Sequence, residues 1–160
     1  MTADIERRTD AGAGEDRPRL RAELMSILTG LWYEIDHKGG TSAAAFFTPE
    51  AELRFSNAIF QGTAEIAQVY AERSARGPRV SRHLVTNLHL LEVEAERVRA
   101  VSVLLLFGED GEPPRPSTLP VLVGDVFDEF ELRDGRWLIS SRWIQNLFIG
   151  TATELAVPQD

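Results

Sequence analysis

Between residues 20 and 35 the apolar side chains recur every three or four positions, a spacing that predicts an amphipathic helix. The apolar positions are Leu20, Leu24, Ile27, Leu28, Leu31 and Ile35. The pattern stops at the sequence HKGG, residues 37–40, where two glycines can adopt the positive φ that ends a helix at low cost. We therefore expect this first helix to end there.

Two further helices are expected from shorter segments. Residues 43–47 follow two hydroxyl side chains that can cap a helix, and Pro49 closes the segment. Residues 63–76 show one apolar stripe at helical spacing and are followed by Gly77, which predicts a third helix. Between these two helices, residues 51–62 alternate loosely and are expected to form a short strand or hairpin.

After the third helix the pattern becomes that of extended strands. Four long strands are expected, over residues 79–93, 97–109, 121–132 and 137–150. An Asp-Gly pair between the last two strands is a strong hairpin signal, so these strands are expected to run antiparallel.

Helices in the N-terminal half followed by antiparallel strands predict an α+β fold, with the helices on one face of the sheet. We expect a disordered lead-in over residues 1–17, which are charged and rich in Gly and Ala, then one domain over residues 18–150. Residues 151–160 are expected to form a C-terminal tail.

Composition narrows the range of partners and compartments. The net charge of −8 argues against nucleic acid and anionic membranes as partners. The absence of cysteine removes disulfides and thiolate metal sites. The N-terminus lacks the apolar core of a secretory signal, and no window reaches the about 18 apolar residues of a membrane helix, so a cytoplasmic protein is expected.

Five stretches, in this order and spacing, resemble the SnoaL-like group of the nuclear transport factor 2-like superfamily. They are WYEIDHKG, AAAFFTPEAELRF, FQGTAEI, SRHLVTNLHL and DEFELRDGRWLISSRW. The resemblance runs from about residue 20 to 150. It implies a cone in which a strongly curved, mostly antiparallel sheet wraps around three helices and encloses an apolar pocket. Members include dehydratases, a dehydrochlorinase, ketosteroid isomerase, polyketide cyclases, epoxide hydrolases and non-catalytic subunits, so the fold alone leaves the function open.

The resemblance implies a catalytic pair formed by Asp36, near the end of the first helix, and His83, within a strand. A histidine can abstract a carbon-bound proton near neutral pH, and a carboxylate on its other ring nitrogen sets the tautomer and stabilises the imidazolium. The alternative interpretation is a core histidine bonded to backbone and a surface carboxylate at a helix end. Only tertiary structure could bring these two positions together.

Substrate-binding residues are expected around this pair. Trp32 and Tyr33 precede Asp36, and the resemblance implies a tyrosine from this helix that polarises a substrate carbonyl, although packing at the surface suits Tyr33 better. Arg142 lies where the dehydrochlorinase has a basic residue facing the pocket, where it could stabilise a departing anion or an enolate. A strand arginine facing water is the alternative.

Three more polar strand residues are candidates. Asn87 shares the face of His83 if the strand is regular, and can either orient a ligand or satisfy backbone groups. Asp125 and Asp128 lie on opposite faces of their strand, so one could be a second acid in the pocket. A metal site at Asp36, His83 and His89 is the weakest alternative, because the spacing lacks a metal-binding signature.

The sequence contains no P-loop, dinucleotide fingerprint or nucleophile elbow, and no cofactor is expected. The first hypothesis is a cofactor-independent lyase or isomerase, such as a dehydratase, cyclase or double-bond isomerase of secondary metabolism. Its substrate would be a small apolar ring compound or polyketide-like molecule. The second is a non-catalytic ligand-binding or assembly module, and either one is expected to form a homodimer or higher homo-oligomer through the sheet face. The third is epoxide hydrolysis by Asp36, Arg142 and one strand aspartate.

Overall fold

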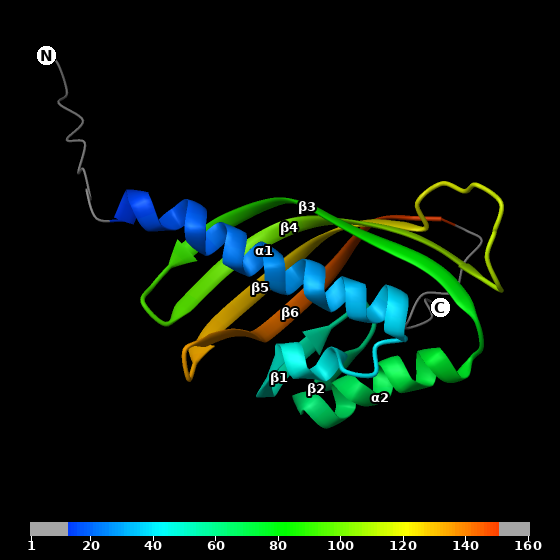
Figure 1. Cartoon of the computed structure of the whole chain (residues 1–160), viewed down its shortest axis with the longest axis horizontal. Helices are drawn as coiled ribbons and strands as arrows, with labels where there is room; N and C mark the ends of the chain where they lie inside the picture. Colours follow the sequence, from blue (N-terminus) through cyan, green and yellow to red (C-terminus); the bar gives the residue numbers. More distant parts are fainter. Residues whose placement is uncertain (1–12, 151–160) are drawn as a thin grey trace, which may run out of the picture.

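The computed structural model describes residues 13–150, which form two α-helices, one 3-10 turn and six strands (Figure 1). In chain order the elements are α1 (Ala13–Lys38), η1 (Ala43–Phe46), β1 (Phe47–Arg54), β2 (Ile59–Gln61), α2 (Gly62–Ala75), β3 (Arg79–Val93), β4 (Arg97–Asp110), β5 (Leu122–Arg133) and β6 (Arg136–Ile149).

The six strands form one sheet in the order β2-β1-β6-β5-β4-β3. Every neighbouring pair is antiparallel except β1 and β6, which run parallel. Figure 1 shows α1 lying along one face of the curved sheet, with α2 below its C-terminal end. The predicted α+β class with a mostly antiparallel curved sheet is therefore confirmed.

The core lies between α1 and the inner face of the sheet. Leu24, Leu28 and Leu31, from the predicted apolar stripe, are fully buried. They pack in one cluster with Phe130 of β5 and Ile139 of β6. Burial alternates along β4 and β5, so that one set of side chains faces this core and the other set faces outward.

The C-terminal end of α1 is held by Glu34. Its carboxylate accepts hydrogen bonds from the Ser42 backbone N–H at 2.9 Å and from the Thr41 hydroxyl at 3.1 Å. These bonds, the Ser42 bond foremost, lower the pKa of Glu34. Gly39 and Gly40 have positive φ, as expected for the end of this helix, and the chain reverses here. This fixed turn sets the position of Asp36, two residues beyond Glu34.

Two expected elements differ from the structure. The expected second helix is a four-residue 3-10 turn, because β1 begins directly after it at Phe47. Pro49 lies inside β1, at a shift in register with β6 where the missing N–H costs no ladder bond. The α1 helix begins at Ala13, so its backbone takes in residues 13–17 of the expected lead-in. The remainder of that lead-in, residues 1–12, and the expected tail, 151–160, lie outside the described residues.

Candidate functional site

A cavity of about 330 Å³ opens at the C-terminal end of α1, between this helix, α2 and the inner face of the sheet. Its walls are mainly apolar in the sheet, where Leu104, Leu106, Leu122 and Ile144 contribute side chains. Its polar lining includes Asp36, Tyr70, Arg73, Arg79, Ser81, His83 and Asn146. A cavity of this size, with apolar walls and a few convergent polar groups, suits a small organic molecule.

Asp36 and His83 meet in this cavity although they lie on different elements. Oδ1 of Asp36 is 2.7 Å from Nδ1 of the His83 ring, and Oδ2 accepts the backbone N–H of His83 at 2.8 Å. The Ser81 hydroxyl donates a further hydrogen bond to Oδ1 at 2.7 Å. Ser81 and His83 are two residues apart on β3 and so share one face of the strand. Three hydrogen bonds therefore hold the carboxylate against the imidazole.

The environment keeps Asp36 ionised. Burial pushes the pKa of Asp36 upward, but the hydrogen bonds from His83 and Ser81 and the charge of His83 outweigh burial, so the net pKa lies below its usual value. An ionised carboxylate can only accept, so Nδ1 of His83 donates the proton in their hydrogen bond. In the neutral imidazole, Nε2 is then the unprotonated nitrogen and can accept a proton.

Trp32 fixes the plane of the His83 ring. The two rings stack in parallel, with centroids 4.1 Å apart and an interplanar angle of 5°. Trp32 lies one helical turn before Asp36 on α1, so both side chains point toward β3. The guanidinium of Arg142 lies 5.3 Å from the centroid of the same tryptophan ring. Trp32 therefore contacts the candidate base directly and also contacts a buried cation.

The structure contradicts the placement of Arg142 in the pocket. Its guanidinium is buried, and Nε and Nη2 donate to the two carboxylate oxygens of Asp128 at 2.7 and 3.0 Å. Neither residue lines the cavity. Asp128 does face inward, as one of the two strand aspartates was expected to do, but the pair neutralises both charges within the core. Because Arg142 and Asp128 bind each other, neither of them is available to contact a substrate in the cavity.

Three other expected substrate-binding residues also lie away from the cavity. Tyr33 is 56% exposed and does not line the cavity, and its ring lies 4.6 Å from that of His37. Asn87 is exposed, because a bulge in β3 gives it a φ of 55° and breaks the alternation that begins at His83. Asp125 lies on the outer face of β5, opposite to Asp128. The convergence of Asp36, Arg142 and a strand aspartate that epoxide hydrolysis would need is therefore absent.

The same bulge separates His89 from the expected metal set. His89 is exposed and pairs with Val101 on the outer face of the sheet. Within residues 13–150, no three His, Asp or Glu side chains gather closely enough to hold a metal ion. No helix in this part of the chain is long and apolar enough to cross a membrane.

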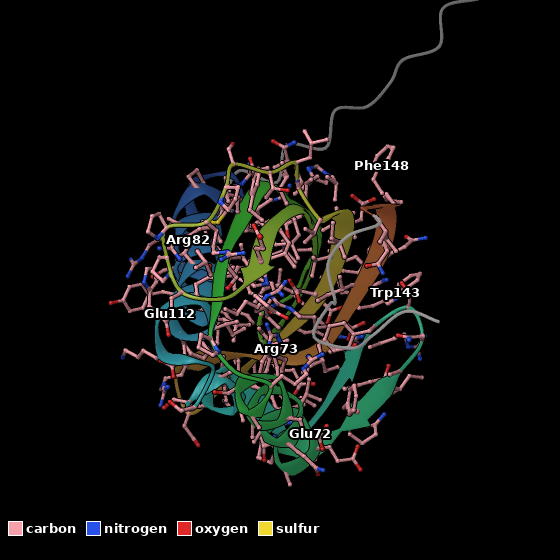
Figure 2. The ribbon with its side chains drawn as sticks, turned by 90° about the vertical axis from the view of Figure 1, so that its right-hand side faces the viewer. Glu72, Arg73, Arg82, Glu112, Trp143 and Phe148 are labelled. Atoms are coloured by element: carbon pink, nitrogen blue, oxygen red, sulfur yellow. The ribbon has the colours of Figure 1, made fainter. Side chains whose placement is uncertain are left out.

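The polar side chains that line the cavity without having been predicted from the sequence include Tyr70 and Arg73 from α2, and Arg79 and Ser81 from β3. Burial raises the pKa of Tyr70 to about 12, against the opposing charge of Arg142, so the phenol stays protonated and can donate a hydrogen bond. Figure 2 shows Arg73 on the side of α2 that faces the sheet. The sequence did contain a signal that these residues face inward. Tyr70 and Arg73 lie on the apolar stripe of α2, and Arg79 lies four residues before His83, on the same face of the strand.

The sequence model of the SnoaL-like domain family matches residues 16–143, which is most of the chain. The chain belongs to the SnoaL-like family. No curated protein sequence matches the chain significantly.

Several solved structures share the SnoaL-like fold with this chain. A candidate scytalone dehydratase from Novosphingobium aromaticivorans superposes with a TM-score of 0.75 at 18% identity, over 90% of this chain and 95% of that one. A hexachlorocyclohexane dehydrochlorinase, LinA type 2, gives 0.69 at 19% identity, over 85% and 90%. The β subunit of a candidate aromatic-ring-hydroxylating dioxygenase from N. aromaticivorans gives 0.73 at 16% identity, over 89% and 98%. At these identities the likeness establishes the fold, which a dehydrochlorinase and a dioxygenase β subunit share.

Proposed function

We propose that this SnoaL-like protein is a cofactor-independent lyase or isomerase in which His83 removes a proton from a carbon of the substrate. The observation that supports this proposal best is the 2.7 Å contact between Asp36 Oδ1 and His83 Nδ1, inside a cavity of about 330 Å³. Dehydration, dehydrohalogenation, double-bond shifts and aldol-type cyclisation all require this proton transfer. The apolar walls favour a small ring compound or polyketide-like substrate.

In this mechanism Nε2 of His83 accepts the proton while Nδ1 keeps its own. The imidazolium that forms is stabilised by the Asp36 carboxylate, whose lowered pKa keeps it ionised throughout. The stacked Trp32 ring holds the imidazole in one plane, so little reorganisation is needed when the charge develops. His83 can then return the proton to a leaving group or to another carbon of the substrate.

Tyr70 supplies a hydrogen-bond donor for the substrate oxygen that becomes negatively charged in this reaction. Removing a proton beside a carbonyl puts negative charge on the carbonyl oxygen, and a protonated phenol in an apolar cavity stabilises that charge. The raised pKa of Tyr70, about 12, keeps the proton on the phenol at neutral pH. We therefore propose Tyr70, rather than the exposed Tyr33, as the residue that polarises the substrate oxygen.

Deuterium exchange tests the proton transfer without the natural substrate. The probe is 2-tetralone, an apolar ring ketone with an acidic α-carbon, whose exchange in D2O is followed by NMR. His83→Gln is expected to lower the catalysed rate at least about 100-fold, because a positioned general base contributes that much. Asp36→Asn and Tyr70→Phe should each lower the rate about tenfold or more. The matched control is His89→Gln, which removes an exposed histidine from the outer face of the same strand.

Two results of this experiment would contradict the proposal. One is exchange by the wild-type protein that is no faster than exchange in imidazole buffer of equal concentration. The other is a His83→Gln variant that keeps the wild-type rate.

The second candidate is a non-catalytic ligand-binding or assembly module. It is favoured by exposed apolar side chains on the outer face of the sheet, where Trp143 stacks with Phe127 at a centroid distance of 5.3 Å. Figure 2 shows Trp143 and Phe148 on the outer side of β6, away from α1. We propose that this face binds a second copy of the chain. Light scattering would then give twice the monomer mass, and Trp143→Glu the monomer mass; a wild-type monomer would refute the homodimer.

A further inference from the structure

Two cations lie together where the cavity meets solvent. Arg73 of α2 and Arg79 of β3 both line it, and their side chains are 13% and 12% exposed. Both guanidinium groups donate to one carboxylate oxygen, Oδ1 of Asp110 at the end of β4, Arg79 over 2.9 Å. Asp110 is 55% exposed, which places the cluster at the opening. Because two guanidinium groups share one carboxylate, these three groups carry one net positive charge.

The fold makes room for this cluster at Gly108. A Cβ atom at position 108 would collide with the Arg79 guanidinium, so the absence of a side chain lets the guanidinium lie against β4. Each bond to Asp110 uses one of the five N–H groups that a guanidinium carries. The cluster thus already binds one carboxylate oxygen, and it has the planar donor geometry that suits a second carboxylate.

Charge is distributed unevenly along the cavity. Arg79 and His83 lie four residues apart on one face of β3, which separates their Cα atoms by about 13 Å. At the His83 end the ionised Asp36 carboxylate repels an anion, whereas at the opening the arginine pair attracts one. Leu106 pairs with His83, and Leu104 pairs with Val85 still farther from the opening, so the apolar side chains of the sheet gather at the His83 end. An elongated ligand with one acidic end therefore fits in one orientation only.

We propose that Arg73 and Arg79 form a carboxylate-recognition subsite, so that the substrate is an apolar molecule with a carboxylate held at the opening and its reacting carbon near His83. This assignment rests on the proposed function in one respect, because it takes the cavity to be the substrate site. The arginine pair selects acids over neutral analogues and aligns them for the base.

A matched pair of ligands tests the subsite without any turnover. The probes are 2-naphthoate and its neutral analogue 2-naphthamide, with affinities measured by isothermal titration calorimetry. The wild-type protein is expected to bind the carboxylate at least about tenfold more tightly, the effect of one charge-assisted hydrogen bond. In the double variant Arg73→Gln/Arg79→Gln the two ligands should bind within about twofold of each other. Arg136→Gln, an exposed arginine at the β5–β6 hairpin, should keep the preference.

A charge-preserving variant and a salt titration distinguish the loss of positive charge from a folding defect in the double variant. Arg73→Lys/Arg79→Lys should keep a carboxylate preference of at least about threefold. In the wild-type protein, added NaCl should weaken 2-naphthoate binding and leave 2-naphthamide unchanged. Equal binding of the two ligands to the wild-type protein, no binding of either, or a preference that survives in the glutamine double variant would overturn the subsite.

The experiments can refute the carboxylate subsite and the proposed function independently of each other. A lost carboxylate preference with deuterium exchange intact would remove the subsite alone. A carboxylate preference without exchange by His83 would remove the proposed catalysis alone, and leave a carboxylate-binding module.

Discussion

The buried ion pair between Asp128 and Arg142 leads to a quantitative prediction about stability. Both side chains are 1% exposed, and two hydrogen bonds of 2.7 and 3.0 Å join them. Asp128→Asn removes the negative charge while keeping the size and shape of the side chain. Arginine cannot lose its proton in a protein, so the variant would hold an unpaired cation in its core. Nη1 of Arg142 is already without a hydrogen-bond partner among the described residues.

The expected loss follows from burial. Removing one partner of a buried pair costs about 3–5 kcal/mol, because the remaining charge is uncompensated. The Trp32 ring, 5.3 Å from the guanidinium, and the amide oxygen of the new asparagine keep part of the stabilisation. We therefore expect a loss of about 3 kcal/mol for Asp128→Asn. Replacing both partners, as in Asp128→Leu/Arg142→Met, should leave the stability within about 1 kcal/mol of wild type, because no charge then needs compensation.

Urea unfolding, followed by circular dichroism and tryptophan fluorescence, measures these free energies. The control is Arg97→Gln, which breaks the exposed pair of Arg97 Nη2 with Glu129 Oε2 at 2.7 Å and should cost less than about 1 kcal/mol. A loss of stability in Asp128→Asn no larger than that of this control would refute an uncompensated buried charge. A double variant that is less stable than Asp128→Asn would refute it as well.

Two further predictions concern Asp36 and the bulge in β3. The pKa of Asp36 is lowered in the folded protein, so its ionisation stabilises the fold above the unfolded pKa of about 4, and this contribution is lost as pH falls through the folded pKa. The stability difference between wild type and Asp36→Asn should therefore narrow in acid, and urea titrations that give a constant difference from pH 7 to pH 3 would contradict this. At Asn87, with φ of 55°, the alanine variant should lose about 1 kcal/mol and the glycine variant less than about 0.5 kcal/mol; equal urea midpoints for the two would argue against backbone strain.

Periodicity alone was sufficient for most of the fold. The apolar stripe from Leu20 to Ile35 predicted the buried face of α1, and Gly39 and Gly40 marked its end, because both features depend on neighbouring residues only. The alternation in β4 and β5 and the Asp-Gly hairpin likewise predicted antiparallel strands. The parallel pairing of β1 with β6 had no local signal, since it joins segments about 90 residues apart.

Local sequence patterns did not predict which residues come together in the candidate site. The resemblance to a family implied that Asp36 and His83 belong together, but only the folded chain brings a helix end and a strand into contact across 47 positions. Asn87 was expected on the same face as His83, but side chains alternate regularly along a strand only until a bulge interrupts them. Nothing in the sequence marked the bulge in β3.

Apart from residues 43–47, the sequence by itself determined which segments are helices and strands and which faces are apolar, because these depend on spacing along the chain. Tertiary structure decided which polar groups share the cavity. Arg142 is paired with Asp128 and removed from it, while Tyr70, Arg73 and Arg79 enter it. The physical reason is that a buried charge must find a partner wherever the packing offers one, and that partner lies on another element whose distance along the chain carries no information about its distance in space.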